Sequence, residues 1–177
     1  MNDIVKITQA LDFAARKHVN QRRKGIDQEP YINHLAEVAR LLAEATDGND
    51  SELVMAALLH DCIEDQKVKY EELLQLFGED VADLVREVTD NKELDPGERK
   101  RLQVEHASDL SDRAKRLKIA DKISNLHSVK ASPPRHWDAL RKQEYFEWAK
   151  AVVAGCRGVS ESLERKFDEA NLESPTC

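Results

Sequence analysis

The segment 56–65 restricts the possible fold and chemistry of this chain more than any other segment does. Four apolar residues in a helix-forming pattern run directly into His60 and Asp61, and Glu64 and Asp65 follow at once. A stretch that is expected to be buried should not end in an imidazole and three carboxylates unless another group offsets the cost of removing them from water. A divalent metal ion is the natural compensating group.

The spacing of these side chains is compatible with one site. In an uninterrupted helix, residues three or four apart share a face, so His60, Asp61 and Glu64 are expected on the same side. The adjacent His60 and Asp61 can still converge on one ion at their tips. The ordinary alternative is a polar helix end with a hydrogen-bonded histidine, and for an isolated His-Asp pair that interpretation would be preferred.

A mononuclear metal site usually needs three or more protein ligands, so a His-Asp pair alone is not enough. Two further segments supply additional candidate ligands. His34 follows Pro-Tyr-Ile-Asn at a predicted helix start, and Asp121 lies in an apolar helical pattern, where Lys118 or Lys122 could also neutralise it. The predicted metal ligands are His34, His60, Asp61 and Asp121. This mixture of nitrogen and oxygen ligands tolerates Mn²⁺, Fe²⁺, Zn²⁺ or Mg²⁺.

Composition narrows the class of protein. The 177 residues are 41% hydrophobic and 34% charged, which suits a globular domain with a sizeable core. The net charge of −7 disfavours a nucleic-acid binder. No segment has the length of a membrane span or the pattern of a signal peptide, so no membrane partner is expected. Three cysteines without a CxxC motif indicate reduced thiols and a cytoplasmic location.

Apolar residues recur with helical periodicity throughout, and no segment alternates as a strand does. We therefore predict an all-α fold, with one compact domain of roughly eight to ten helices over residues 1–172 and a flexible tail at 173–177. One helix should be capped by Ser51 and should carry His60 and Asp61. Gly78 and the pair at 133–134 should end helices, Pro96 should begin one, and another should run from 137 to 154.

The order His, His-Asp, Asp resembles that of the HD-domain phosphohydrolases. Further segments narrow the resemblance: Arg22-Arg23-Lys24, Glu64-Asp65, and the stretches 87–90, 98–103 and 143–148. Over nearly its whole length the chain is similar to the stand-alone small alarmone hydrolases, the SpoT-homologue family of metazoan type. It is also similar to the hydrolase half of Rel/SpoT enzymes.

This resemblance implies a (p)ppGpp 3′-pyrophosphohydrolase that uses one Mn²⁺ ion, although other divalent transition metals are compatible with the ligands. It implies catalytic roles for Glu64 and Asp65. The implied nucleotide contacts are Arg23 on guanine, Lys24 on a phosphate, Tyr31 lining the pocket, Asn125 and Ser128 on the ribose, and Arg141 and Tyr145 near a phosphate. The expected partner is ppGpp or pppGpp. A homodimer is compatible with the sequence, which does not fix the oligomeric state.

The chain departs from the family pattern at three places. His127 replaces a usual arginine, Cys62 replaces a threonine or valine, and the stretch 95–97 lacks a lysine that relatives often carry. These departures leave the hydrolytic core intact and bear on affinity and on the choice of substrate. Two alternatives therefore stay open: an HD phosphatase for another nucleotide, such as NADPH at its 2′-phosphate, and a catalytically silent nucleotide-binding sensor.

Overall fold

The computed structural model describes residues 2–172, and within that range the chain forms helices and loops without a β-strand. In chain order the helices are α1 (Asp3–Lys17), α2 (Ile32–Ala45), α3 (Ser51–Leu59), α4 (Cys62–Gln66), α5 (Tyr70–Phe77), α6 (Glu79–Val88), α7 (Pro96–His106), the 3-10 helix η1 (Ala107–Asp109), α8 (Asp112–Ala131), α9 (Ala139–Cys156) and α10 (Glu161–Leu172). The all-α prediction and the expected number of helices are confirmed. The tail predicted at 173–177 lies outside the described residues.

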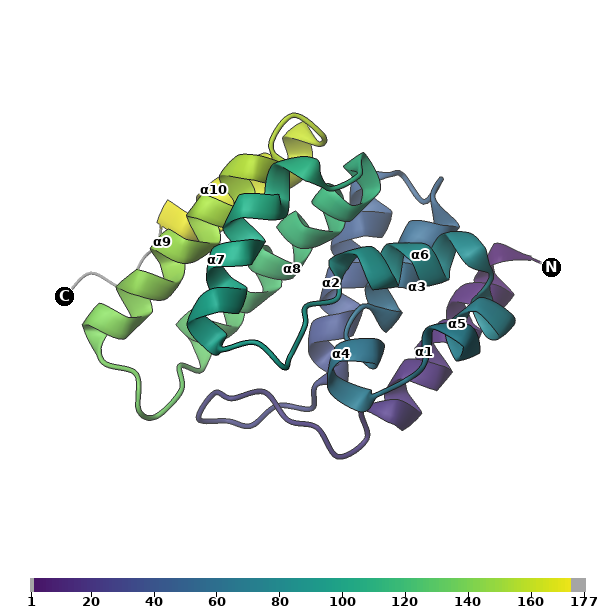
Figure 1. Ribbon diagram of the computed structural model, residues 1–177, viewed down its shortest axis with the longest axis horizontal. Coiled ribbons are helices and arrows are strands. Elements are labelled where there is room, and N and C mark those ends of the chain that lie inside the picture. Colours follow the sequence, from purple (N-terminus) through teal and green to yellow (C-terminus); the bar gives the residue numbers. More distant parts are fainter. Residues whose placement is uncertain (1, 173–177) are drawn as a thin grey trace. The chain divides into compact units, whose positions relative to one another are not determined.

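The chain divides into two compact units (Figure 1). The first consists of Met1–Gln21 and Pro30–Glu93 and holds α1 to α6. The second consists of Arg22–Glu29 and Leu94–Cys177 and holds α7 to α10 together with the loop of the basic triplet. None of the described helices is long and apolar enough to cross a membrane.

In the first unit, α3 is the central helix. All nine of its residues except Glu52 are buried, and it packs against α1, α2 and α6. A helix that is apolar on every side must be surrounded by other elements, so the amphipathic α2 and α6 cover it. Its N-cap is Asp50, whose carboxylate accepts a 3.0 Å hydrogen bond from the Leu53 amide. The prediction of Ser51 as the cap was wrong by one residue.

The helix does not continue through His60 and Asp61, contrary to the prediction. Helix α3 ends at Leu59, His60 is its C-cap, and Asp61 is the N-cap of the separate short helix α4. The Ala57 carbonyl, which a continuing helix would pair with the Asp61 amide, lies 2.7 Å from His60 Nδ1 instead. A side chain therefore satisfies the end of the buried helix, and Asp61 is released from the helical register.

In the second unit, α8 packs against α9 and α10, and α7 packs against α9. The loop 22–29 folds onto the C-terminal end of α8: the Asp27 amide donates to Ser132 Oγ at 2.8 Å, and the Ile26 amide to the Pro133 carbonyl at 3.2 Å. A Cβ at Gly25 would lie 2.0 Å from the Ser132 carbonyl oxygen, so only glycine fits this close approach.

Helix boundaries in both units coincide with glycine, proline and capping residues of the sequence. Helix α5 ends before Gly78, α7 begins at Pro96, and α8 ends before the prolines at 133–134, as predicted. Helix α9 begins at Ala139, two residues later than predicted, because Asp138 caps it by accepting a 2.7 Å hydrogen bond from the Arg141 amide.

Gly155 provides a test of packing in the second unit. Its Cβ would lie 2.7 Å from Ala107 Cβ in η1. Replacing glycine by alanine inside a helix normally stabilises by about 1 kcal/mol. We expect Gly155→Ala to destabilise the protein, because overpacking costs about 1–3 kcal/mol. Urea denaturation measures the difference, with Ala154→Gly on the exposed side of α9 as the control for propensity alone. A more stable Gly155→Ala protein would contradict the packing described.

Candidate active site

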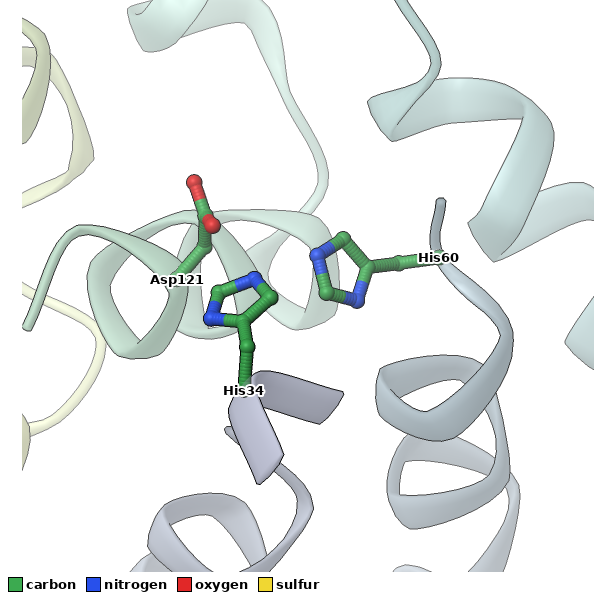
Figure 2. A group of neighbouring side chains, drawn as sticks. All are labelled: His34, His60 and Asp121. Atoms are coloured by element: carbon green, nitrogen blue, oxygen red, sulfur yellow. The ribbon is translucent and has the colours of Figure 1, made fainter. Parts of the chain in front are cut away.

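Three of the predicted metal ligands lie together. His34 is in the first turn of α2, His60 caps α3 and Asp121 lies midway along α8. Each offers one ligand atom, and these atoms lie within 4.8 Å of one another; Figure 2 shows the two rings and the carboxylate grouped together. Atoms bound to one ion at about 2.1 Å are up to about 4 Å apart. The spacing of these three atoms is therefore near that of a metal site.

The hydrogen bond of His60 fixes which of its nitrogens can bind metal. Nδ1 lies 2.7 Å from the Ala57 carbonyl, which only accepts hydrogen bonds, so Nδ1 carries the proton. The lone pair is then on Nε2. The ring is only 6% exposed, so its orientation is also held by packing. This arrangement, with one ring nitrogen anchored to a carbonyl and the other presented, is typical of metal-ligating histidines.

Asp61 lies beside the two histidines within the first unit. Its Oδ2 is 3.1 Å from His60 Nε2 and 3.7 Å from His34 Nε2, and the Tyr31 hydroxyl donates to the same oxygen at 2.7 Å. The helix break at residue 60, and not a shared helical face, brings Asp61 to this position. Two imidazole nitrogens with nearby carboxylates fit a divalent transition ion better than Mg²⁺, which prefers oxygen ligands alone.

Glu64 and Asp65, in α4, have different surroundings. Burial raises the pKa of Glu64, the Asp61 and Asp90 carboxylates raise it further, and a 3.2 Å hydrogen bond from the Asp90 amide opposes them. Asp65 accepts a 2.6 Å hydrogen bond from Gln21 on Oδ2, and Lys92 pairs with Oδ1. The first acid is thus desolvated, whereas the second is held by donors on both of its oxygens.

In the second unit, Arg23 is tied to α8. Its guanidinium donates to Asn125 Oδ1 at 2.8 Å and approaches Ser128 Oγ at 3.4 Å. Asn125 in turn donates to Asp121 Oδ1 at 2.7 Å. A continuous chain of hydrogen bonds therefore joins the basic loop to a candidate metal ligand. Lys122, which is buried, pairs with the other Asp121 oxygen at 2.9 Å, as the sequence had left open.

Tyr145, on α9, lies in an aromatic row, with its ring centroid 5.2 Å from that of Trp137, which precedes the helix, and 5.3 Å from that of Trp148. Desolvation raises the pKa of its hydroxyl, while the positive charges of Lys122 and Arg23 oppose the shift. Arg141, on the same helix, is exposed and lies 5.8 Å from the Trp137 centroid.

Lys24 is also exposed, on the loop beside Arg23. The second unit therefore brings Arg23, Asn125 and Ser128 together, and it places Tyr145 near Arg23.

Several polar neighbours of these residues were not predicted from the sequence. The Lys100 ammonium lies 4.7 Å from the Trp148 centroid and 5.4 Å from the Tyr145 centroid. Desolvation lowers the pKa of Lys100, and the positive charges of Arg141 and Lys122 lower it further. Its only signal was its place inside the stretch 98–103. In the first unit, the neighbours that were missed are His18, Gln21 and Lys92. Gln21 and Asp65 are 44 residues apart, so no local pattern marks their contact.

Known proteins that resemble this chain identify its family. A family model described as HD domain matches residues 10–149. A guanosine-3′,5′-bis(diphosphate) 3′-pyrophosphohydrolase MESH1 from Xenopus tropicalis is 48% identical over 97% of this chain and 96% of its own length. The protein of the same description from Homo sapiens is 47% identical over 92% of this chain and 91% of its own.

A solved structure of a metazoan ortholog of SpoT, which is described as hydrolysing ppGpp, superimposes with a TM-score of 0.91. It is 45% identical and covers 96% of both chains. The matched region includes all four predicted metal ligands: His34, His60, Asp61 and Asp121. The chain therefore belongs to the HD domain family and, within it, to the MESH1-type stand-alone hydrolases related to the hydrolase domain of SpoT.

Proposed function

We propose that this chain is a guanosine-3′,5′-bis(diphosphate) 3′-pyrophosphohydrolase, which converts its substrate and water into GDP and pyrophosphate. The observation that carries the proposal is the buried group of His34, His60 and Asp121, in a chain so similar over its whole length to enzymes of that description. We assign the activity to one HD-type domain over residues 1–172. Since Cys62 and Cys156 are buried and not disulfide-bonded, we also place the enzyme in the cytoplasm.

We assign the metal ion to His34, His60, Asp61 and Asp121, and we take Mn²⁺ as the ion. Its two nitrogen ligands support a transition metal over Mg²⁺. When bound, such an ion lowers the pKa of a water molecule and polarises a phosphate oxygen. His60 is held ready for this by its bond to the Ala57 carbonyl, and Asp61 by the Tyr31 hydroxyl.

Glu64 and Asp65 would orient the attacking water and exchange its proton. The raised pKa of Glu64 suits proton exchange, because a catalytic acid or base works best when its pKa approaches the working pH. Asp65, with Gln21 and Lys92 on its two oxygens, suits the holding of a fixed orientation. The different surroundings of the two acids support different roles.

The nucleotide would be held mainly from the second unit. Arg23 would pack on the guanine, since a planar guanidinium stacks well and Asn125 and Ser128 already hold it in place. Asn125 and Ser128 would also contact the ribose. The phosphates would meet Lys24, Arg141 and Tyr145, to which we add Lys100 because of its place beside Tyr145. Tyr31 would line the pocket as well as hold Asp61.

The two alternatives make different predictions. A silent sensor would be expected to lack a ligand or one of the acids, and this chain has them all. A phosphatase for NADPH would need the same metal and acids, so a substrate panel must separate the two activities. Guanosine 3′,5′-bis(diphosphate) and its pentaphosphate analogue, compared with NADPH under Mn²⁺, give the necessary test.

The first expected outcome concerns metal and product. Chelation should abolish turnover, and Mn²⁺ should restore it better than Mg²⁺, because two of the assigned ligands are imidazole nitrogens. Chromatography of the products should show GDP and pyrophosphate in equal amounts. Full activity in excess EDTA, in protein that elemental analysis finds free of metal, would be incompatible with the site.

The second concerns Arg23. Arg23→Ala should raise KM for guanosine 3′,5′-bis(diphosphate) and leave metal content unchanged, because a stacking cation contributes about 1–2 kcal/mol in a partly desolvated site. Arg22→Ala is the matched control, since it removes the same charge from the neighbouring, exposed position of the loop. Equal KM values for the two variants would remove Arg23 from the nucleotide site.

The third concerns Tyr31. Tyr31→Phe removes only the hydroxyl that donates to Asp61. Partners that hold a metal ligand typically contribute 10–100-fold to metal affinity, so Mn²⁺ should bind about 10-fold more weakly. Isothermal titration calorimetry of the metal-free protein with Mn²⁺ measures the change in the dissociation constant without any turnover. An unaltered dissociation constant would show that the hydroxyl does not hold Asp61 for the metal.

A further inference from the structure

Four polar side chains of the first unit form a continuous line that ends on Asp65. Cys62 Sγ lies 3.5 Å from His18 Nε2, His18 Nδ1 lies 2.6 Å from Gln21 Oε1, and Gln21 Nε2 lies 2.6 Å from Asp65 Oδ2. His18 and Gln21 come from the C-cap of α1 and the segment after it, and Cys62 and Asp65 come from α4. Only Asp65 has a role in the function proposed above.

The direction of each hydrogen bond follows from its acceptor. The Asp65 carboxylate only accepts, so the Gln21 amide must turn its nitrogen toward it and its oxygen toward His18. That oxygen only accepts, so His18 carries its proton on Nδ1. The lone pair on Nε2 is then available to accept from the Cys62 thiol. With this tautomer the 3.3 Å approach of Gln66 Nε2 to His18 Nδ1 is not a hydrogen bond, and Gln66 donates to Gln21 Oε1 instead.

The imidazole at the centre of this line is held by stacking on one face and by contacts at both ring nitrogens. His18 is 2% exposed and stacks on Tyr31, with centroids 5.3 Å apart and planes at 14°. Burial lowers the pKa of His18, which keeps the ring neutral, with one donor and one acceptor. Because Tyr31 also donates to Asp61, the ring that orients Gln21 packs on the tyrosine that holds a candidate metal ligand.

We propose that Gln21 is a positioning residue for the hydrolytic reaction: it fixes the orientation of the Asp65 carboxylate, and His18 fixes the orientation of Gln21. The inference rests on the function proposed above. Lys92 also pairs with Asp65, but its side chain is 47% exposed, so it is less constrained than the amide. Without Gln21, the carboxylate would keep its charge and its lysine but lose the donor that sets its angle.

A double-mutant cycle tests this role. The variants are Gln21→Leu, Asp65→Asn and the two combined, with kcat and KM measured for guanosine 3′,5′-bis(diphosphate) under Mn²⁺. We expect Asp65→Asn to lower kcat about 10²–10⁴-fold, the usual effect of a positioned acid–base group. Gln21→Leu should lower kcat roughly 10-fold with KM nearly unchanged, as for other orienting partners. In the Asp65→Asn background, Gln21→Leu should have almost no further effect, because the two residues act as one unit.

Variants of His18 separate orientation from packing. His18→Phe keeps a ring against Tyr31 but offers no donor, so its kcat should fall as that of Gln21→Leu does. His18→Asn places an amide donor near the former Nδ1 and should recover part of the loss. Melting temperature and metal content are measured for every variant, and Gln21→Met replaces Gln21→Leu if the latter fails to fold.

Two results would overturn the inference alone. One is an active wild-type enzyme in which Gln21→Leu lowers kcat by the same factor with and without Asp65, since a purely structural role is additive. The other is an Asp65→Asn variant with native kcat. A wild-type protein that releases no pyrophosphate from guanosine 3′,5′-bis(diphosphate) would instead overturn the proposed function, and with it the inference.

Discussion

The hydrogen bond between His60 Nδ1 and the Ala57 carbonyl is the interaction on which the site depends most. It ends α3, the apolar helix at the centre of the first unit, at a point where a free carbonyl would be buried. It fixes the tautomer of His60 and so presents Nε2 as a ligand. It also releases Asp61 from the helix, which places Asp61 Oδ2 within 3.7 Å of both histidines. One side-chain contact thus connects the packing of the core with the placement of two candidate metal ligands.

Three carboxylates within five residues have different surroundings, because each has different hydrogen-bond partners. Asp61 receives a hydroxyl from Tyr31, Glu64 is desolvated and meets a backbone amide, and Asp65 is held by Gln21 and Lys92. Without such partners, like charges this close would only repel one another. Donors contributed by distant segments therefore convert a uniform acidic cluster into groups suited to metal binding, proton exchange and orientation.

The sequence predicted those features that have a local signal. Periodicity predicted the helices, Gly78 and Pro96 marked helix ends, and residue type and spacing predicted His34, His60 and Asp121. The continuous helix through His60 was wrong, because periodicity does not reveal that a side chain can take over a backbone carbonyl. Gln21 and His18 were missed because their contacts with α4 join residues far apart in sequence. The roles assigned to the individual catalytic and nucleotide-binding residues stay predictions.

Helix α8 carries a candidate metal ligand and two of the proposed nucleotide contacts of the second unit. Asp121, Asn125 and Ser128 follow one another at about one helical turn, so a candidate metal ligand and the two residues that hold Arg23 share one rigid face. The loop that carries Arg23 is anchored at the C-terminal end of the same helix, where Gly25 allows its backbone to approach Ser132. Because Asn125 bonds to both Arg23 and Asp121, a single amide joins the proposed guanine contact to a candidate metal ligand.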